Sequence, residues 1–436
     1  MAGAGYGVRV TQLAQAAGGP PGRAPWDVAS KRLPPAFRLA CACCQWPPSP
    51  ARDAAVRGAA EGVDWDAFLR VAVRQRVVGL VHAALRSAGV SAPAPVEREL
   101  VKAALLIQRR GLVLATEAIR LQRLFAAEGV ASLVIKGAPL AQLAYGAQGL
   151  KQGRDIDLVV GLADAEEGLR LLRREGYRVL QPTCELTPAK LQLLLRHHKD
   201  LELRHPEGRM NVELHWRLID NPALLRSFGA ASPSQTVEVL GDGVATLADR
   251  ELFAYLCVHG ASHCWFRLKW LADLNAWLTS KRQEELEALH RFAKAEGVGE
   301  CAGQALALCR GLLGLRLPAS LEPELTRLKV RLLVAGALDA MAGGGAELDL
   351  QRRPLGPFRL MPSQFLRGRG LGFFLAQCWL VTQSLDDMLS VPLPRPLHFL
   401  YPLLRLPLWL TRIVRRHVGA GRAATPAAPA IGQGQP

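Results

Sequence analysis

Hydrophobic residues change their spacing several times along this chain. Between residues 36 and 128 they recur three or four positions apart, as in the run from Trp65 to Val73. That spacing is the period of an α-helix with one buried side, and Pro-rich breaks separate the successive runs. We therefore expect an all-helical N-terminal region over 36–128. Residues 1–35 are rich in Gly, Pro and Ala and predict a flexible leader.

From residue 131 short apolar runs alternate with helical spacing. The runs over 131–136 and 155–160 predict β-strands. The elements expected after them are a helix over 164–175, a strand over 176–181, a helix over 188–196 and a hairpin around 206–208 whose second strand is 209–216. Together these elements predict a mixed core of helices and strands over 129–220.

Helical spacing returns from about residue 246. We expect the region 221–315 to be helical and to close a cleft over the core. Residues 316–418 are less regular and rich in Leu, Arg and Pro, and we expect further helices there. The last segment, 419–436, predicts a disordered tail.

Composition narrows the class of protein. Half of the 436 residues are apolar, 21% are charged and the mean hydropathy is +0.10, which excludes a wholly disordered chain or a small disulfide scaffold. The nine cysteines are an odd number in mostly apolar surroundings, which is typical of reduced core thiols in a cytoplasmic protein. The cluster at Cys41, Cys43 and Cys44 is an alternative metal site, but no second pair follows at zinc-site spacing.

Two carboxylates share one face of the strand at 155–160. Asp155 and Asp157 are one residue apart, so both side chains project to the same side. On the later strand, Glu213 projects to the same side as His215. If the two strands pair, three carboxylates meet, and Mg²⁺ or Mn²⁺ between them would align a hydroxyl and a triphosphate for in-line displacement. The alternative for Asp-x-Asp alone is a solvated sheet face.

A phosphate-binding turn is expected upstream of these strands. A predicted strand ends at Lys136 and Gly137, and a short helix follows from Ala138. Backbone N–H groups at a helix start bind phosphate oxygens, and glycine permits their close approach. Lys136 is one of only ten lysines beside 44 arginines, and its ammonium group is expected to contact the same phosphates.

The motifs in this order resemble a known family. They read KGAPLAQLAYG, then DIDLVV, then NVELHW, and finally HGASHCWFRLKWLADL over 259–274. The chain thereby resembles the bacterial uncharacterised nucleotidyltransferase family, a branch of the polymerase-β-like nucleotidyltransferase superfamily, over roughly residues 36–415.

The resemblance implies a fold and a set of roles. The fold would be α+β, a polymerase-β-like core with a small mixed sheet flanked by largely helical regions. Asp155 and Asp157 would be metal ligands, Glu213 the third carboxylate, and Lys136–Gly137 the turn that holds the nucleotide phosphates. Two positions depart from the family pattern: Ala138 replaces the common Ser or Gly, and Lys151 stands where we expect Arg.

Several other polar residues are candidates for the nucleotide site. His215 would orient a carboxylate or contact a phosphate, with a structural hydrogen bond as the alternative. His259 and His263 are four residues apart on one predicted helix, and we expect them to line the cleft opposite the carboxylates rather than to bind zinc. Lys269 and Asp273 have the same spacing and read as an ordinary surface pair.

The predicted function is transfer of a nucleoside monophosphate from an NTP to an acceptor. The net charge of +16 lies at the two ends, whereas 111–350 sums to −1, so a small-molecule or protein acceptor is favoured over nucleic acid. The rivals are a non-catalytic nucleotide- or partner-binding descendant of the fold, suggested by Ala138, and a membrane-surface adaptor. The adaptor would bind through the basic, apolar segment 395–418.

Overall fold

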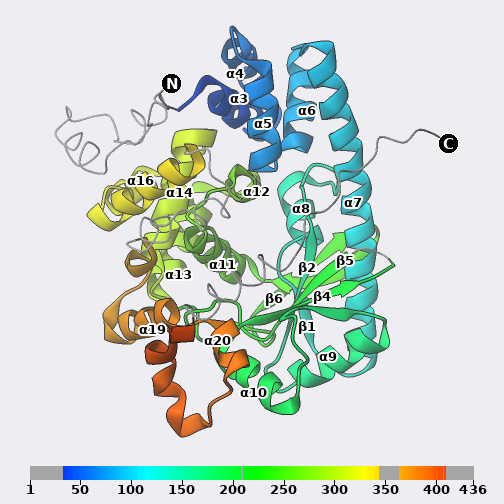
Figure 1. Ribbon diagram of the computed structural model, residues 1–436. Helices are drawn as coiled ribbons and strands as arrows, with labels where there is room; N and C mark the ends of the chain where they lie inside the picture. Colours follow the sequence, from blue (N-terminus) through cyan, green and yellow to red (C-terminus); the bar gives the residue numbers. More distant parts are fainter. Residues whose placement is uncertain (1–32, 208–209, 343–362, 406, 409–436) are drawn as a thin grey trace, which may run out of the picture.

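The computed structural model describes residues 33–207, 210–342, 363–405 and 407–408 (Figure 1). Its first elements are the helices α3 (Pro35–Cys43), α4 (Pro50–Ala60), α5 (Trp65–Gln75), α6 (Val78–Ala88) and α7 (Ala94–Ala127). Local capping sets two of these starts, because the side chains of Ser49 and Asp64 accept hydrogen bonds from backbone N–H groups in the first turns of α4 and α5. All the regular elements described between residues 35 and 127 are helices. The leader predicted over 1–35 lies almost entirely outside the described residues.

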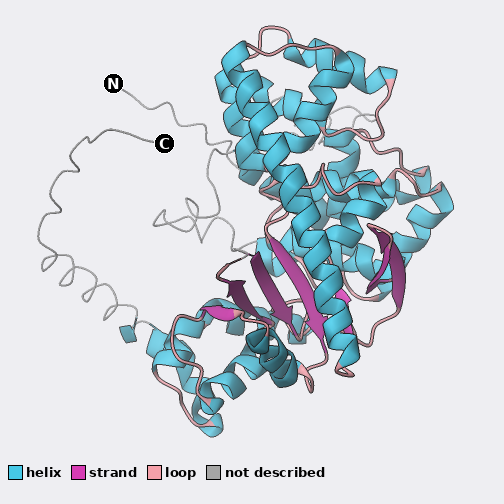
Figure 2. Cartoon of the chain, turned by 90° about the vertical axis from the view of Figure 1, so that its right-hand side faces the viewer, coloured by secondary structure: helices cyan, strands magenta, loops and turns pink. Residues whose placement is uncertain are grey.

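Helix α7 connects two hydrophobic cores. Its 34 residues would span about 50 Å at the usual helical rise. Val96 and Leu100 in its first half belong to a core shared with the other helical regions, whereas Leu121 and Phe125 near its end belong to the core of the sheet. Figure 2 shows the helix running from the helical part down across the sheet. Helix α7 thus connects the core of the sheet with the core of the helical part.

The main sheet has five strands in the order β1-β2-β5-β4-β3. The strands and the helices between them are β1 (Ser132–Val134), α8 (Ala138–Tyr145), β2 (Asp155–Val160), α9 (Ala165–Arg174), β3 (Arg178–Gln181), α10 (Pro188–His197), β4 (Asp200–His205) and β5 (Met210–His215). Only the β2–β5 pair of this sheet is parallel; the pairs β1–β2, β3–β4 and β4–β5 are antiparallel. Each element of the expected core is present, and the α+β class with a small mixed sheet is confirmed.

The two faces of this sheet differ in chemistry. Alternate residues such as Ile156 and Leu158 are buried in one core with α7 and α9, so the residues between them point to the other face. Gly168 brings α9 close to the sheet, because a Cβ at this position would lie 3.2 Å from the Phe125 ring and 3.5 Å from Leu214. The packed face therefore fixes the direction in which the carboxylates project.

A second, two-stranded sheet opens the region 221–315. It is the hairpin β6 (Ser234–Val239) and β7 (Asp242–Leu247), which the sequence pattern did not predict. Helices follow it: α11 (Asp249–Ser262), α12 (Leu268–Leu278), α13 (Gln283–Ala295), α14 (Gly299–Leu313), η2 (Ala319–Leu321), α15 (Glu322–Leu325) and α16 (Leu328–Ala342). Most of their apolar residues join the core of the N-terminal helices. The N-terminal helices and the helices after β7 thus share one hydrophobic core, with α11, α12 and α14 among its members (Figure 1).

The last described elements return to the sheet. They are α19 (Gly370–Thr382), α20 (Leu385–Ser390) and η3 (Arg395–Leu400). Met388, Leu389 and Tyr401 are buried in the core of the sheet. Among the described residues no helix has the length and apolar character needed to cross a membrane. The tail predicted over 419–436 lies outside the described residues, as do residues 409–418.

Candidate active site

A cavity of about 260 Å³ lies between the polar face of the main sheet and helices α11 and α12. Nine of the ten residues expected at the metal and nucleotide site line it: Lys136, Gly137, Lys151, Asp155, Asp157, Glu213, His215, His259 and His263. Ala138 is the exception. It is buried in the core of the sheet, and its carbonyl oxygen accepts a hydrogen bond from the Gln148 side chain at 3.1 Å.

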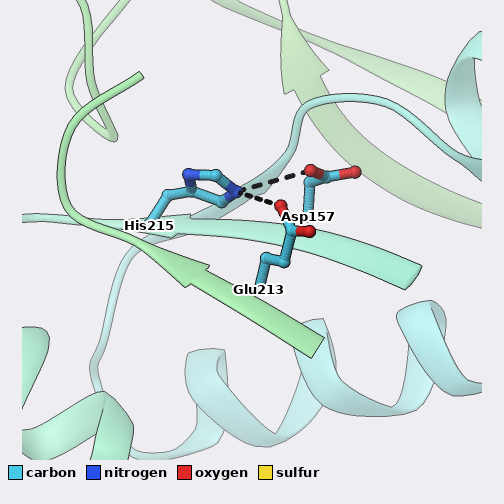
Figure 3. A group of neighbouring side chains, drawn as sticks. All are labelled: Asp157, Glu213 and His215. Atoms are coloured by element: carbon cyan, nitrogen blue, oxygen red, sulfur yellow. Dashed lines mark ion pairs between the residues drawn. The ribbon is translucent and has the colours of Figure 1, made fainter. Parts of the chain in front are cut away.

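The parallel register of β2 and β5 sets the centre of the site. Asp157 lies directly opposite Glu213, and both project from the face that carries His215 (Figure 3). The His215 Nε2 atom is 3.4 Å from Asp157 Oδ1 and 3.3 Å from Glu213 Oε2. One ligand atom from each of the three side chains lies within 4.8 Å of the others. The group therefore offers oxygen and nitrogen donors at a spacing that a single divalent ion can bridge.

Asp155 lines the same cavity but is not a member of this group. It is two residues before Asp157, which along a strand is a separation of about 7 Å. Asp155 is also more exposed, because it begins β2 at the edge of the cavity. The structure thus brings together Asp157, Glu213 and His215, with Asp155 as a carboxylate further along the same strand.

Lys136 neutralises the buried Asp157. Its Nζ atom is 2.7 Å from Asp157 Oδ1, and the aspartate side chain is only 2% exposed. Burial opposes the positive charge of Lys136, but the carboxylate of Asp157 outweighs it, so the pKa of the lysine is well above its usual range. For the same reason the pKa of Asp157 is well below its usual range despite burial, with His215 adding to the effect of Lys136. Asp157 is therefore ionised, with the ammonium group of Lys136 beside it.

His215 links the carboxylates to a neighbouring strand. Burial opposes its charge, but the neighbouring carboxylates of Asp157, Glu213 and Asp200 raise its pKa to about 9. On its other side, Nδ1 is 3.6 Å from Asp200 Oδ2. Burial and the neighbouring Asp157 raise the pKa of Glu213. An imidazolium at this position stabilises the negative charges while no metal ion is bound.

The turn after β1 presents open backbone to the cavity. Gly137 has φ +64°, a conformation that side chains other than glycine rarely adopt, and a Cβ at this position would meet no atom within 4 Å. It is the N-cap of α8, whose first residues are Ala138 and Pro139. The N-terminal end of α8 therefore faces free space beside Lys136, as a phosphate-binding turn requires.

Lys269 and Asp273 on α12 are both buried, so the prediction that they form a surface pair is wrong. Lys269 is 9% and Asp273 4% exposed. Asp273 pairs instead with Lys151, whose Nζ is 3.5 Å away, and accepts a hydrogen bond of 2.9 Å from the Tyr145 hydroxyl. The ammonium group of Lys269 donates to the Gln152 carbonyl oxygen at 3.2 Å. The spacing of four residues predicted the shared helix face but not that this face is buried.

His259 and His263 form part of an aromatic wall opposite the carboxylates. Their ring centroids are 4.8 Å apart, and that of His263 is 5.0 Å from the Trp270 ring. Burial lowers the pKa of His259 well below its usual range, and Lys136 and His263 add to this effect. His259 is therefore a neutral imidazole. Within the described part of the chain, neither histidine belongs to a cluster that would hold a metal ion.

Lys199 and Asp200 are among the site residues that the sequence analysis did not single out. Lys199 and Asp200 form an ion pair at the start of β4 and line the cavity. Asp200 is directly opposite His215 in the antiparallel β4–β5 register. The alternation of β4 would have placed Asp200 on the same face as Glu213 once the hairpin was predicted. The cysteine cluster lies elsewhere: Cys41, Cys43 and Cys44 are free and buried, as expected for core thiols.

Comparison with known families agrees with this geometry. A family model described as "Uncharacterised nucleotidyltransferase" matches residues 61–314, more than half of the chain. The chain belongs to this nucleotidyltransferase family. A comparison with curated proteins finds no match. Membership supports nucleotidyl transfer as the general function.

Proposed function

We propose that the protein transfers a nucleoside monophosphate from an NTP to a hydroxyl or phosphate group of a small-molecule or protein acceptor. The observation that carries the proposal is the parallel register that sets Asp157 beside Glu213, in the cavity that also contains the Lys136–Gly137 turn. An acceptor oxygen would bond to the α-phosphorus while the bond to the leaving oxygen breaks. Pyrophosphate would leave with the electron pair, and the acceptor proton would pass to water.

Asp155, Asp157 and Glu213 are the residues that we propose as ligands for Mg²⁺ or Mn²⁺. Their donor oxygens suit these ions, and the ligand atoms of Asp157 and Glu213 are close enough to share one. When bound, the ion supplies positive charge that neutralises the triphosphate. His215 follows Glu213 on β5 and contacts the carboxylates of both Asp157 and Glu213.

The remaining lining residues fit the nucleotide. The open backbone at Gly137 and the ammonium groups of Lys136 and Lys151 are placed to contact phosphate oxygens. His259 and His263 supply an aromatic wall across the cavity. The small volume of the cavity and the near-zero net charge of 111–350 favour a compact acceptor in the cytoplasm over nucleic acid.

The test is incubation with each labelled NTP, Mg²⁺ or Mn²⁺ and cell extract, followed by a search for nucleotidylated products. Asp155→Asn should reduce product formation by at least 100-fold, on the order of the loss expected when a metal ligand is removed. Glu202→Gln is the matched control, because Glu202 lies opposite Glu213 in the register but is not among the described residues that line the cavity. Equal product from wild type and Asp155→Asn would contradict the proposal.

A second candidate function is nucleotide binding without transfer. Its support is the contact of Lys136 with Asp157 at 2.7 Å, which places a protein cation where a metal ion would bind, together with Ala138 in place of a hydroxyl residue. ATP binding with no product from any NTP would favour this candidate over transfer.

A further inference from the structure

The four lysines of the cavity differ in how their charges are balanced. Lys136 is paired with Asp157, Lys199 with Asp200 and Lys151 with Asp273. In the part of the chain that the structure describes, Lys269 has no carboxylate within ion-pair distance. One neutral carbonyl oxygen, that of Gln152, accepts a hydrogen bond from it.

The surroundings of Lys269 make its charge costly. The side chain is 9% exposed, and burial is the main reason that its pKa is lowered to about 7, with Lys151 and Arg76 adding repulsion. Asp155 and Asp273 attract the ammonium group, but their effects are the smaller ones. A buried ammonium group near two other cations is stable when an anion neutralises it.

Three separate parts of the chain contribute positive side chains to this side of the cavity. Arg76 is the C-cap of α5 and is held there in a left-handed conformation with φ 56°. Lys151 lies between α8 and β2, and Lys269 lies in the first turn of α12. All three line the cavity. Lys151 is paired with Asp273, whereas Lys269 has no carboxylate at ion-pair distance among the described residues, so a phosphate group that enters the cavity can neutralise the charge of Lys269.

We propose that Lys269, Lys151 and Arg76 form a subsite for a phosphate group of a substrate. The group is either the terminal phosphate of the NTP or a phosphate carried by the acceptor. A guanidinium group and two ammonium groups are the donors that proteins use to bind phosphate oxygens. The inference rests on the proposed function for its substrates, but phosphate binding can be measured without turnover.

The experiment is calorimetric titration of the full-length protein with inorganic phosphate and with tripolyphosphate, in EDTA. Wild type should bind at least one of these probes, and Lys269→Met should weaken that binding roughly tenfold or more, the usual worth of a hydrogen bond to a charged group. Lys269→Arg should retain most of the affinity. Lys294→Met is the control, because Lys294 is paired with Glu324 outside the cavity and its loss should change nothing.

A melting curve separates this role from a structural one. If Lys269 only supports the fold, Lys269→Met lowers the unfolding midpoint of the protein without added phosphate. The subsite instead predicts an unchanged or higher midpoint, because a buried uncompensated charge is removed, and loss of the stabilisation that added phosphate gives wild type. No probe binding to wild type, equal binding to wild type and Lys269→Met, or a lowered midpoint without added phosphate would overturn the inference.

The source of the phosphate group is identified by two further titrations with Mg²⁺. If Lys269→Met weakens ATP binding but not AMP binding, the subsite holds the terminal phosphate of the NTP. If ATP and AMP bind as in wild type while binding of the phosphate probe is lost, the subsite belongs to the acceptor. Either result supports the inference. If wild type turns over no NTP but still binds phosphate in a way that depends on Lys269, the proposed function is refuted and the phosphate subsite is not.

Discussion

The substitution Asp157→Asn should destabilise the fold in addition to disabling the site. Asp157 is the buried partner of the Lys136 ammonium group at 2.7 Å and lies 3.4 Å from His215 Nε2. Asparagine keeps the shape of the side chain but removes the charge that both cations need. Leaving a buried charge without its partner costs about 3–5 kcal/mol.

The expected loss lies at the lower end of this range. Glu213 remains 3.3 Å from the imidazole, so His215 keeps one carboxylate, and mainly Lys136 is left unpaired. We therefore expect Asp157→Asn to lower the free energy of unfolding by about 3 kcal/mol. The double variant Lys136→Met/Asp157→Asn should recover about 2 kcal/mol of this loss, because it removes both members of the pair.

The assay is urea denaturation in EDTA, followed by tryptophan fluorescence. Changes in the midpoint are compared among variants, since a protein of this size need not unfold in a single step. Asp155→Asn is the control, because Asp155 is more exposed and outside the cluster, and it should cost less than about 1 kcal/mol. If Asp157→Asn is as stable as wild type, or if the double variant is less stable than either single one, the ion-pair reasoning is refuted.

Three further predictions concern other parts of the molecule. Burial lowers the pKa of His197 to about 4 beside His398. The contribution of this half-buried ring to the free energy of unfolding should therefore be complete above pH ~6.5 and fall by about 1 kcal/mol towards pH 4. Unfolding measured at a series of pH values should show this decrease in wild type but not in His197→Phe. Gly260→Ala should cost at least 2 kcal/mol in thermal unfolding, because the new Cβ would lie 2.2 Å from the Trp265 ring. Burial raises the pKa of Cys43 to about 12, so thiol reagents should leave it unmodified until the protein unfolds, and rapid labelling of native protein would contradict this.

The core could be predicted from the sequence because its signals are local. Alternation along β2 and β5 fixes which side chains share a face, and this was enough to bring Asp157 and Glu213 to one cavity. The hairpin β6–β7 also carried a local signal, since Leu240 and Gly241 form a turn with positive φ between alternating residues. The helical spacing that follows the hairpin instead led to the expectation that the whole region 221–315 is helical.

The buried cations of the site could not be predicted from spacing. Lys269 and Asp273 are correctly placed on one helix face, but their burial depends on α12 packing against α8, an element more than 120 residues earlier in the chain. The same holds for the pairing of Asp273 with Lys151. Sequence patterns report which residues share a face, whereas the partner of that face is decided by tertiary packing.

One buried side chain, that of Gln75, joins helices that are far apart in the chain. Its Nε2 donates to the Met341 carbonyl oxygen at 3.2 Å, across 266 positions, and its Oε1 accepts from the Leu268 N–H at 2.6 Å. At the usual rate of synthesis, the ribosome needs roughly 15 to 50 seconds to synthesise the chain from Gln75 to Met341. During that time α3 to α6 can pack on one another, but the surface that they share with α12, α14 and α16 has no final partner. The N-terminal helices should therefore reach their final packing only after α16 has been synthesised.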